Sequence, residues 1–128
     1  MIKLMNNQVK SKARVTDFGE VNTSEREVNA MLDLVKQETE RLDSRFLEPA
    51  CGDGNFLIEV LNRKLEILVK KYKKNQYEFE KNSIVVIGSI YGVDILEDNA
   101  QSARKRLFNG FIEVYEKYFK EYSNANFI

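Results

Sequence analysis

The segment Arg45–Leu57 constrains the fold more than any other part of the chain. A short apolar run ends in Glu48, Pro49 forces a turn, and Gly52 and Gly54 flank an aspartate just before an apolar helix begins. This is the pattern of a strand, a glycine loop and a helix, with which open α/β folds hold nucleotide-like ligands at the carboxyl end of a strand. Glycine lets the backbone touch the ligand where a Cβ atom would intrude, and the helix amides face its anionic portion.

The composition indicates one folded domain over residues 1–128, since 43% of the residues are hydrophobic and 31% are charged. Twenty acidic residues balance twenty basic ones, so no net charge steers the chain toward nucleic acid. The longest apolar run, Ile84–Ile87, is too short to span a bilayer, and one cysteine without a signal-like N-terminus predicts a cytoplasmic protein. Without histidine, we expect no zinc site and no Cys/His or Ser/His dyad.

The first half of the chain predicts two helices around one strand. Residues 1–16 are polar and expected to be irregular. Ser24 and Glu27 match a capping box, and the apolar residues that follow keep helical spacing, which predicts a helix over about 24–41. A strand over about 45–48 and a helix over about 54–74 follow.

The second predicted helix has an apolar stripe and a lysine-rich face. The stripe consists of Leu57, Leu61, Leu65, Leu68 and Tyr72. Lysines that lie mainly off this stripe, Lys64 among them, are interpreted as a solvated face near the helix C-terminus, with a phosphate-binding patch as the alternative.

The second half of the chain predicts a strand over about 90–94 and further helix. The run Ile84–Ile87 is either a buried helical turn or an early start of that strand. Helical spacing resumes at Leu96, and Asn109-Gly110 predicts a stop. Aromatic residues then repeat at helical spacing from Phe111 to about residue 122, which indicates core or interface, and residues 123–128 are expected to be irregular.

The glycine loop and Asp94 are predicted to form one ligand site. The carboxyl ends of adjacent parallel strands lie together, so Asp94 could accept hydrogen bonds from both hydroxyls of a ribose beside the loop, and Ile95 could pack on a flat base. The loop is shorter than the glycine pattern of dinucleotide folds and lacks the Gly-Lys-Ser/Thr of a P-loop. A ligand with a single adenosine is therefore favoured.

These residues resemble motifs of the S-adenosylmethionine-dependent DNA adenine N6-methyltransferases of restriction–modification systems. Glu48–Phe56 resembles their first motif and Tyr91–Ile95 the second, while Gly19–Ser24 resembles the segment that precedes the first helix. The resemblance covers about residues 17–108. It implies a partial Rossmann-like methyltransferase fold, an α/β fold that is helix-rich with a small parallel sheet, and S-adenosylmethionine as cofactor.

The resemblance also implies which residues hold the cofactor. Glu48, Ala50, Gly52 and Gly54 would shape the pocket around the methionine moiety. Asp94 would take the ribose hydroxyls, Ile95 would flank adenine, and Thr23 would sit near the cofactor carboxylate, with Ser24 where the family usually has proline. The full predicted set is Thr23, Glu48, Pro49, Ala50, Cys51, Gly52, Gly54, Asn55, Phe56, Asp94 and Ile95.

Three of these residues, and also Asp53 between the two glycines, have simpler interpretations. Cys51, between alanine and glycine in a turn, is better explained as a small packed residue than as a nucleophile. Asp53 could cap the following helix instead of contacting a ligand. Asp94 could be a helix N-cap, and Glu48 could be a salt-bridge partner.

The catalytic part of the resembling family is missing. Its Asn/Asp-Pro-Pro-Tyr/Phe motif accepts hydrogen bonds from the target amine and stacks on the flipped base, but Pro49 is the only proline in this sequence. The acidic residue expected after a third strand and a target-recognition region are also missing, and the chain ends about where that strand should begin. We therefore expect no catalytic residue and no metal site here.

Two hypotheses follow. The chain is a truncated or split methyltransferase module that binds S-adenosylmethionine and is inactive alone, or it is a non-catalytic interaction or regulatory protein that kept the scaffold. Two parallel strands leave open edges and normally need cover on both faces. We therefore expect a homodimer or a complementary methyltransferase or restriction subunit as partner, with DNA contacted only through that partner and no membrane association.

Overall fold

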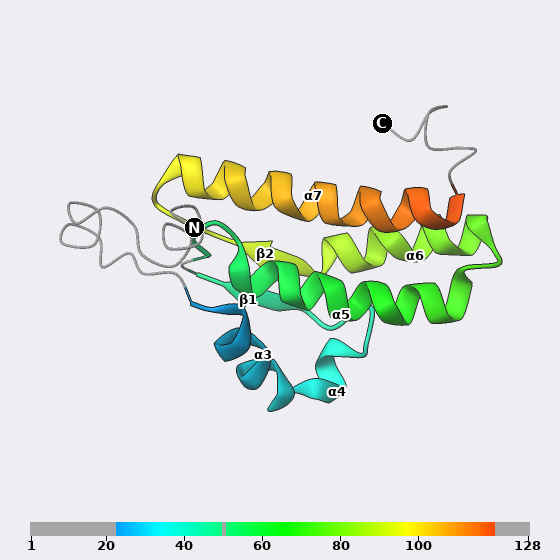
Figure 1. The fold of residues 1–128 in the computed structure, drawn as a ribbon, viewed down its shortest axis with the longest axis horizontal. Helices are drawn as coiled ribbons and strands as arrows, with labels where there is room; N and C mark the ends of the chain where they lie inside the picture. The colour runs from blue at the N-terminus through cyan, green and yellow to red at the C-terminus, as the bar shows by residue number, and fades with distance from the viewer. Residues whose placement is uncertain (1–22, 50, 120–128) are drawn as a thin grey trace.

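The computed structural model describes residues 23–49 and 51–119, which form five helices and two strands. The predicted irregular ends, the motif residues before Thr23 and the predicted site residue Ala50 lie outside this part. In chain order the elements are α3 (Glu25–Asp33), α4 (Lys36–Thr39), β1 (Phe46–Glu48), α5 (Asn55–Tyr72), α6 (Gln76–Gly88), β2 (Ile90–Gly92) and α7 (Glu97–Phe119) (Figure 1).

The two strands form a small parallel sheet. Phe46 pairs with Ile90, Leu47 with Tyr91, and Glu48 with Gly92. The prediction of a helix-rich α/β fold with a small parallel sheet is confirmed at this level. The sheet brings the residues that follow Glu48 next to those that follow Gly92, which is the arrangement the site prediction requires.

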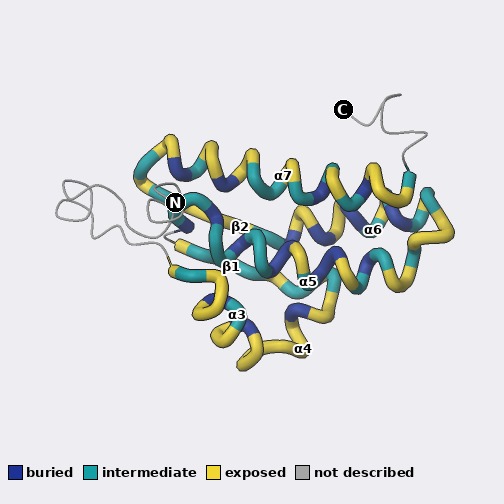
Figure 2. The backbone as a smooth tube through the Cα atoms, in the orientation of Figure 1, coloured by how far each residue is buried: buried dark blue, intermediate teal, exposed yellow. Residues whose placement is uncertain are grey.

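Helix α5 is the centre of the core, because α3, α6, α7 and both strands all pack on it. Its predicted apolar stripe is confirmed, since Leu57, Leu61, Leu65 and Leu68 are buried. Figure 2 shows the buried side of α5 turned toward its neighbours, while the outer sides of α3, α4 and α6 are exposed. Apolar residues recur every three to four positions along α5 and form one row on its surface. The other elements cover that row.

Aromatic rings join α6 to α7 at the end of the molecule away from the sheet. Phe79 lies 5.0 Å from Phe119 and 6.2 Å from Tyr115, measured between ring centroids. The Tyr115 hydroxyl donates a 2.6 Å hydrogen bond to Glu80 and accepts one of 3.1 Å from the Gln76 amide. Of the predicted aromatic repeat, Phe111 and Tyr115 are buried in the core, whereas Tyr118 is 37% exposed. The last member, Tyr122, lies outside the described residues.

The helix predicted over 24–41 is interrupted, so that prediction is wrong in its second half. Helix α3 ends at Asp33, and Val35 has φ −124° and ψ 35°, which is not helical. The short helix α4 then turns Thr39 inward, where its side chain is buried and its hydroxyl donates to the Lys36 carbonyl at 2.6 Å. Of the apolar residues whose spacing predicted one helix, Val28 and Leu32 are buried, but Val35 is 43% exposed. Continuing the helix past Asp33 would therefore bury little further apolar surface.

The start of α3 agrees with the predicted cap. The Ser24 hydroxyl accepts a 3.2 Å hydrogen bond from the backbone N–H of Glu27. We expect Ser24→Ala to lower the free energy of unfolding by about 1 kcal/mol, because this helix donor then loses its partner. Urea denaturation followed by circular dichroism measures the change, and an unaltered midpoint would contradict a capping role.

The ambiguous run Ile84–Ile87 is helical, as one of its two interpretations expected, but it is not a buried turn, because Ile84, Val85 and Ile87 are exposed. It forms the last turns of α6, with Val86 fully buried and Ile84 74% exposed. The strand predicted over 90–94 is shorter than expected, and β2 ends at Gly92. Val93 still donates a 3.1 Å hydrogen bond to the Glu48 carbonyl, so the chain stays aligned with β1 up to Asp94.

The predicted stop at Asn109-Gly110 is wrong, because α7 continues through it to Phe119. A Cβ atom on Gly110 would lie 3.1 Å from Ile58 Cδ1. The glycine therefore allows α7 to approach α5 closely, and helix–helix packing overrides the local tendency of glycine to end a helix.

The assignment of Lys64 to a solvated face is also wrong, since its side chain is fully buried. Its ammonium donates to the Leu42 carbonyl at 3.2 Å, to the Ser89 hydroxyl at 2.7 Å and to the Ser44 carbonyl. Burial lowers the pKa of Lys64 from 10.5 to about 8, against the opposing effect of the Asp43 and Glu38 carboxylates.

Within residues 23–49 and 51–119, no helix has both the length and the apolar character needed to cross a membrane.

Candidate functional site

The carboxylate of Asp94 meets the glycine loop directly. Its Oδ2 accepts a 3.0 Å hydrogen bond from the backbone N–H of Gly52, although the two residues are 42 positions apart. Its Oδ1 accepts from the Leu96 N–H at 2.8 Å and from the Asn99 amide at 3.4 Å. The carboxylate thus holds the loop and accepts hydrogen bonds from the turn and first residues of α7, as the capping interpretation of Asp94 expected in outline. The contact of Asp94 with ribose hydroxyls stays a prediction.

The backbone after β1 stays paired with the segment after β2. The Cys51 N–H donates to the Val93 carbonyl at 3.0 Å, and the Gly54 N–H donates to the Cys51 carbonyl at 2.9 Å. These bonds close the loop tightly between the two strand ends. Gly52 has φ +54° and Gly54 has φ +94°, the left-handed region that glycine occupies without steric cost.

Gly54 is required by packing against α7. A Cβ atom there would lie 3.0 Å from the Cβ of Ala103 and 3.2 Å from its Cα. Gly92 has a similar role at the end of β2, where a Cβ atom would lie 2.5 Å from Leu57 Cδ1 and 3.1 Å from Cys51 Cβ. Sequence reasoning assigned Gly54 to ligand approach, whereas the contacts here are to the protein itself.

Three carboxylates surround the loop. Burial raises the pKa of the Cys51 thiol, and the nearby negative charges of Asp94, Glu48 and Asp53 raise it further. Cys51 is 6% exposed and packs with Leu57 and Ala103, as its interpretation as a packed residue predicted. A thiol with a raised pKa is a poor nucleophile at neutral pH, and the acidic surroundings disfavour a polyphosphate ligand.

Asn55 connects the N-terminal segment to the loop and to α7. Its amide donates to the Thr23 carbonyl at 3.1 Å, and its side-chain oxygen accepts a 2.7 Å hydrogen bond from Arg106. Arg106 also donates to the Asp53 carbonyl at 3.1 Å and lies 3.6 Å from the Asp53 carboxylate. Asp53 does not cap α5, whose N-cap is Gly54 without a side-chain hydrogen bond, so that interpretation of Asp53 is wrong.

The other predicted residues occupy different environments. Ile95 is 81% exposed next to Asp94, and Pro49 is exposed at the start of the loop. Glu48 is half-buried at the end of β1, where its carbonyl accepts from Val93. Phe56 is half-buried against two groups of core residues and turns into the protein.

Two residues that sequence reasoning missed take part in this arrangement, Asn99 and Arg106. They share a face of α7 with Ala103, since the three positions follow one another at intervals of one helical turn. The sequence offered one indication of this face: the small residue Ala103 has a polar residue one helical turn before it and another one turn after it. Only the contact of Ala103 with Gly54 shows that this face meets the loop.

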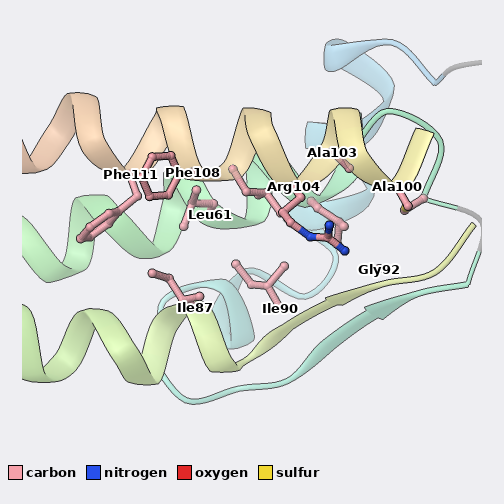
Figure 3. Close-up of a pocket in the computed structure, with 12 residues that line it drawn as sticks. Leu61, Ile87, Ile90, Gly92, Ala100, Ala103, Arg104, Phe108 and Phe111 are labelled. Carbon is pink, nitrogen blue, oxygen red and sulfur yellow. The ribbon is translucent and has the colours of Figure 1, made fainter. Parts of the chain in front are cut away.

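A cavity of about 370 Å³ lies beside the loop, between α5, α7 and β2 (Figure 3). Of the predicted site residues only Cys51 lines it, and Asp94 and Ile95 do not. Among the residues that the structure describes, no three potential metal-ligating side chains lie together. The candidate site is therefore the loop with Asp94 and Ile95, and the cavity is a neighbouring feature.

Comparison with known proteins gives one relative. Over 54% of its length the chain is 33% identical, along 72 residues, to a protein of Methanocaldococcus jannaschii named "Putative type II restriction enzyme and methyltransferase". The chain covers 6% of the length of that protein. No family profile matches the chain, and no solved structure matches it. The chain is therefore similar, over about half of its length, to a small part of a protein named for restriction and methyl transfer.

Proposed function

We propose that this chain is the S-adenosylmethionine-binding module of a DNA (adenine-N6) methyltransferase of a restriction–modification system. The proposal depends on one observation above all: the Asp94 carboxylate and the Gly52 amide, contributed by different strand ends, are hydrogen-bonded at 3.0 Å. A ligand that bridges the loop and the end of β2 would meet both. The name of the Methanocaldococcus jannaschii relative supports the same class of protein.

The chemistry of the surrounding groups fits this cofactor. S-adenosylmethionine carries a positive sulfonium centre and an ammonium group, which the carboxylates of Glu48, Asp53 and Asp94 would stabilise. The exposed Ile95 offers an apolar contact for the adenine. A carboxylate has about four acceptor sites, of which Asp94 uses three within the protein, and the longest of these bonds, 3.4 Å to Asn99, is the one that a ribose hydroxyl would replace most easily.

The module would not methylate by itself. When bound, the cofactor supplies the methyl group, and the residues of this chain hold and orient it. Acceptance of the target adenine requires the Asn-Pro-Pro-Tyr type of motif, and Pro49 is the only proline in the sequence. The catalytic motif and the DNA contacts would therefore come from polypeptide outside these 128 residues.

Calorimetric titration with S-adenosylmethionine tests the proposal. We expect micromolar binding by the native chain, no detectable heat with Asp94→Ala, and about tenfold weaker binding with Ile95→Asp. Because Asp94 also holds Gly52 and Leu96, its removal should cost about 1–3 kcal/mol of stability as well. Ile95 is exposed, so Ile95→Asp separates binding from folding.

Glu97→Ala is the matched control, because it removes an exposed carboxylate three positions after Asp94. The affinity of the Glu97→Ala variant for S-adenosylmethionine should equal that of the native chain. No heat with the folded native chain would contradict the proposal. Methyl transfer to DNA by the purified chain alone would contradict the absence of a catalytic motif.

A second candidate function is a non-catalytic interaction or regulatory protein derived from a methyltransferase. It is favoured by the observation that both Asp94 oxygens already accept hydrogen bonds within the protein, as in a purely structural role. This candidate predicts no cofactor heat together with a stable complex with a restriction–modification protein. The titration above therefore separates the two.

A further inference from the structure

The side chain of Arg106 joins α7 to the glycine loop. Its Nη1 donates a 3.1 Å hydrogen bond to the Asp53 carbonyl and a 2.7 Å hydrogen bond to Oδ1 of Asn55. The same nitrogen lies 3.6 Å from Oδ1 of the Asp53 carboxylate. Hydrogen bonds from a guanidinium are stronger than those between neutral groups, because the donor is charged. Arg106 therefore fixes both the backbone and the side chains where the loop enters α5.

Asn55 extends this connection to the segment before α3. Its side-chain amide donates a 3.1 Å hydrogen bond to the Thr23 carbonyl, while its side-chain oxygen accepts from Arg106. Donor and acceptor of one amide group are both used, which fixes the orientation of that group. Thr23, Asn55 and Arg106 lie on three segments that are distant in sequence. This row of hydrogen bonds therefore holds the start of α3 and the loop against the same helix.

The packing of α7 places Arg106 at the loop. Ala103 lies one helical turn earlier on the same face, and it contacts Gly54 so closely that a Cβ atom on the glycine would lie 3.0 Å from its own Cβ. The side chain of Arg106 is 40% exposed and that of Asp53 is 19% exposed. Because the pair is partly buried, salt screens it less than it would screen a surface ion pair.

The Asp53 carboxylate keeps one acceptor unused. Its Oδ1 is buried and accepts no hydrogen bond from the residues that the structure describes. Arg106 approaches this oxygen at 3.6 Å, which is longer than a hydrogen bond. The guanidinium thus holds a negative oxygen in place without occupying it, and a buried acceptor of this kind is stabilised by a cationic donor.

We propose that Arg106 is a positioning residue for the methionine end of S-adenosylmethionine, the part that carries the sulfonium and ammonium groups. Arg106 holds Asp53 and, through Asn55, the backbone at Thr23, so that these groups are ordered before the cofactor binds. Groups that are already ordered lose less conformational entropy on binding, which raises affinity. The inference rests on the proposed function and assigns a part of that ligand to α7.

The adenosine part of the cofactor gives an internal comparison. The proposed function places this part at Asp94 and Ile95, and Arg106 donates its hydrogen bonds to Asp53 and Asn55 instead. Loss of Arg106 should therefore weaken ligands that carry the methionine end and spare those that lack it. A general loss of structure would weaken both kinds of ligand.

Removal of the guanidinium has two opposing consequences. It loosens Asp53 and Asn55, which weakens binding of the methionine end. It also removes a positive charge near a cationic ligand, which strengthens binding. Interactions of partly exposed charges are weakened by solvent and salt, so we expect the loss of order to dominate. The sign of the change in affinity therefore distinguishes positioning from simple charge repulsion.

Calorimetric titration of the full chain with S-adenosylmethionine and with 5′-methylthioadenosine tests the proposal. We expect Arg106→Met to weaken S-adenosylmethionine binding about tenfold and to change 5′-methylthioadenosine binding by less than about twofold. Arg106→Lys keeps a charged donor and should bring S-adenosylmethionine affinity back to within about threefold of the native value. Lys105→Met is the matched control, because it removes an exposed charge from the neighbouring position of α7, and it should leave both affinities unchanged.

Amide hydrogen exchange, measured by NMR without any ligand, tests the positioning itself. The Gly54 N–H donates to the Cys51 carbonyl at 2.9 Å, so its exchange reports the order of the loop. In Arg106→Met we expect this amide to exchange at least about tenfold faster, while Leu65 in the buried row of α5 keeps its rate. Overall destabilisation would accelerate exchange at both amides.

Several results would overturn the inference alone. These are unchanged or tighter binding of S-adenosylmethionine by Arg106→Met, an equal loss for both ligands, no recovery in Arg106→Lys, and unchanged exchange at Gly54. Binding of S-adenosylmethionine but not of millimolar 5′-methylthioadenosine by the native chain would also overturn it, because adenosine would then not be recognised by itself. Absence of S-adenosylmethionine binding by the native chain overturns the proposed function, and this inference with it, so the two failures are distinguishable.

Discussion

Lys64→Met is expected to destabilise the protein much more at alkaline than at neutral pH. The substitution removes the donor for the Leu42 and Ser44 carbonyls and for the Ser89 hydroxyl. Each carbonyl left without a partner costs about 1–3 kcal/mol, partly offset because a buried charge is also removed. We therefore expect a loss of about 2 kcal/mol at neutral pH.

The pH dependence follows from the pKa of Lys64, which burial lowers from 10.5 to about 8. Between these values the unfolded chain binds the proton and the folded protein does not, so the stability of the native protein rises with pH. The variant lacks this group. The difference in stability between the two proteins should grow by about 2 kcal/mol between about pH 7.5 and about pH 10.

Urea denaturation of both proteins at the two pH values measures this difference directly. Lys70→Met is the matched control, since Lys70 lies on the same helix and is exposed. We expect it to change stability by less than about 0.5 kcal/mol at either pH. If the Lys64→Met difference were the same at both pH values, the ammonium would not be desolvated as the structure indicates.

Gly54→Ala is expected to lower the free energy of unfolding by about 3 kcal/mol. The residue has φ +94°, where a side chain is strained by about 1–3 kcal/mol. The new methyl group would also lie 3.0 Å from the Cβ of Ala103, in the contact between the loop and α7. Thermal or urea denaturation measures the loss, and S-adenosylmethionine titration of the folded fraction measures its effect on the site.

Two further variants separate the causes of this loss. Gly88→Ala is the control, because a Cβ atom there meets nothing within 4 Å, and stability should stay equal or rise slightly. Ala103→Gly in the Gly54→Ala background should relieve the steric part and give a favourable coupling of about 1 kcal/mol. A Gly54→Ala protein as stable as the native one would show that the loop is not held against α7.

The local elements were largely predictable because each has a local cause. Ser24 predicted the start of α3, and the leucine row of α5 predicted both the helix and the face that it buries. The strand before Pro49 and the glycine loop followed from residues whose backbone preferences are strong. That Asp94 lies near the loop followed from the general geometry of parallel strands.

The mistaken predictions share a different cause. Gly110 stops a helix in isolation, yet here its missing side chain lets α7 approach Ile58 of α5. Lys64 is hydrophilic, yet three oxygens, two from the segment before β1 and one from Ser89 at the end of α6, converge on its ammonium. In both cases the deciding partner is distant in sequence, so no local pattern could reveal it.

The sequence by itself determined the strand–loop–helix unit, the acidic residue that follows the second strand, and the absence of the Asn-Pro-Pro-Tyr type of motif. Tertiary structure alone decided how Asp94 uses its oxygens, that Gly54 serves the contact with Ala103, and that Ile90 and Gly92 line an apolar cavity. The physical reason is that backbone preferences act over a few residues, whereas burial and hydrogen-bond pairing depend on neighbours that only the folded chain brings together.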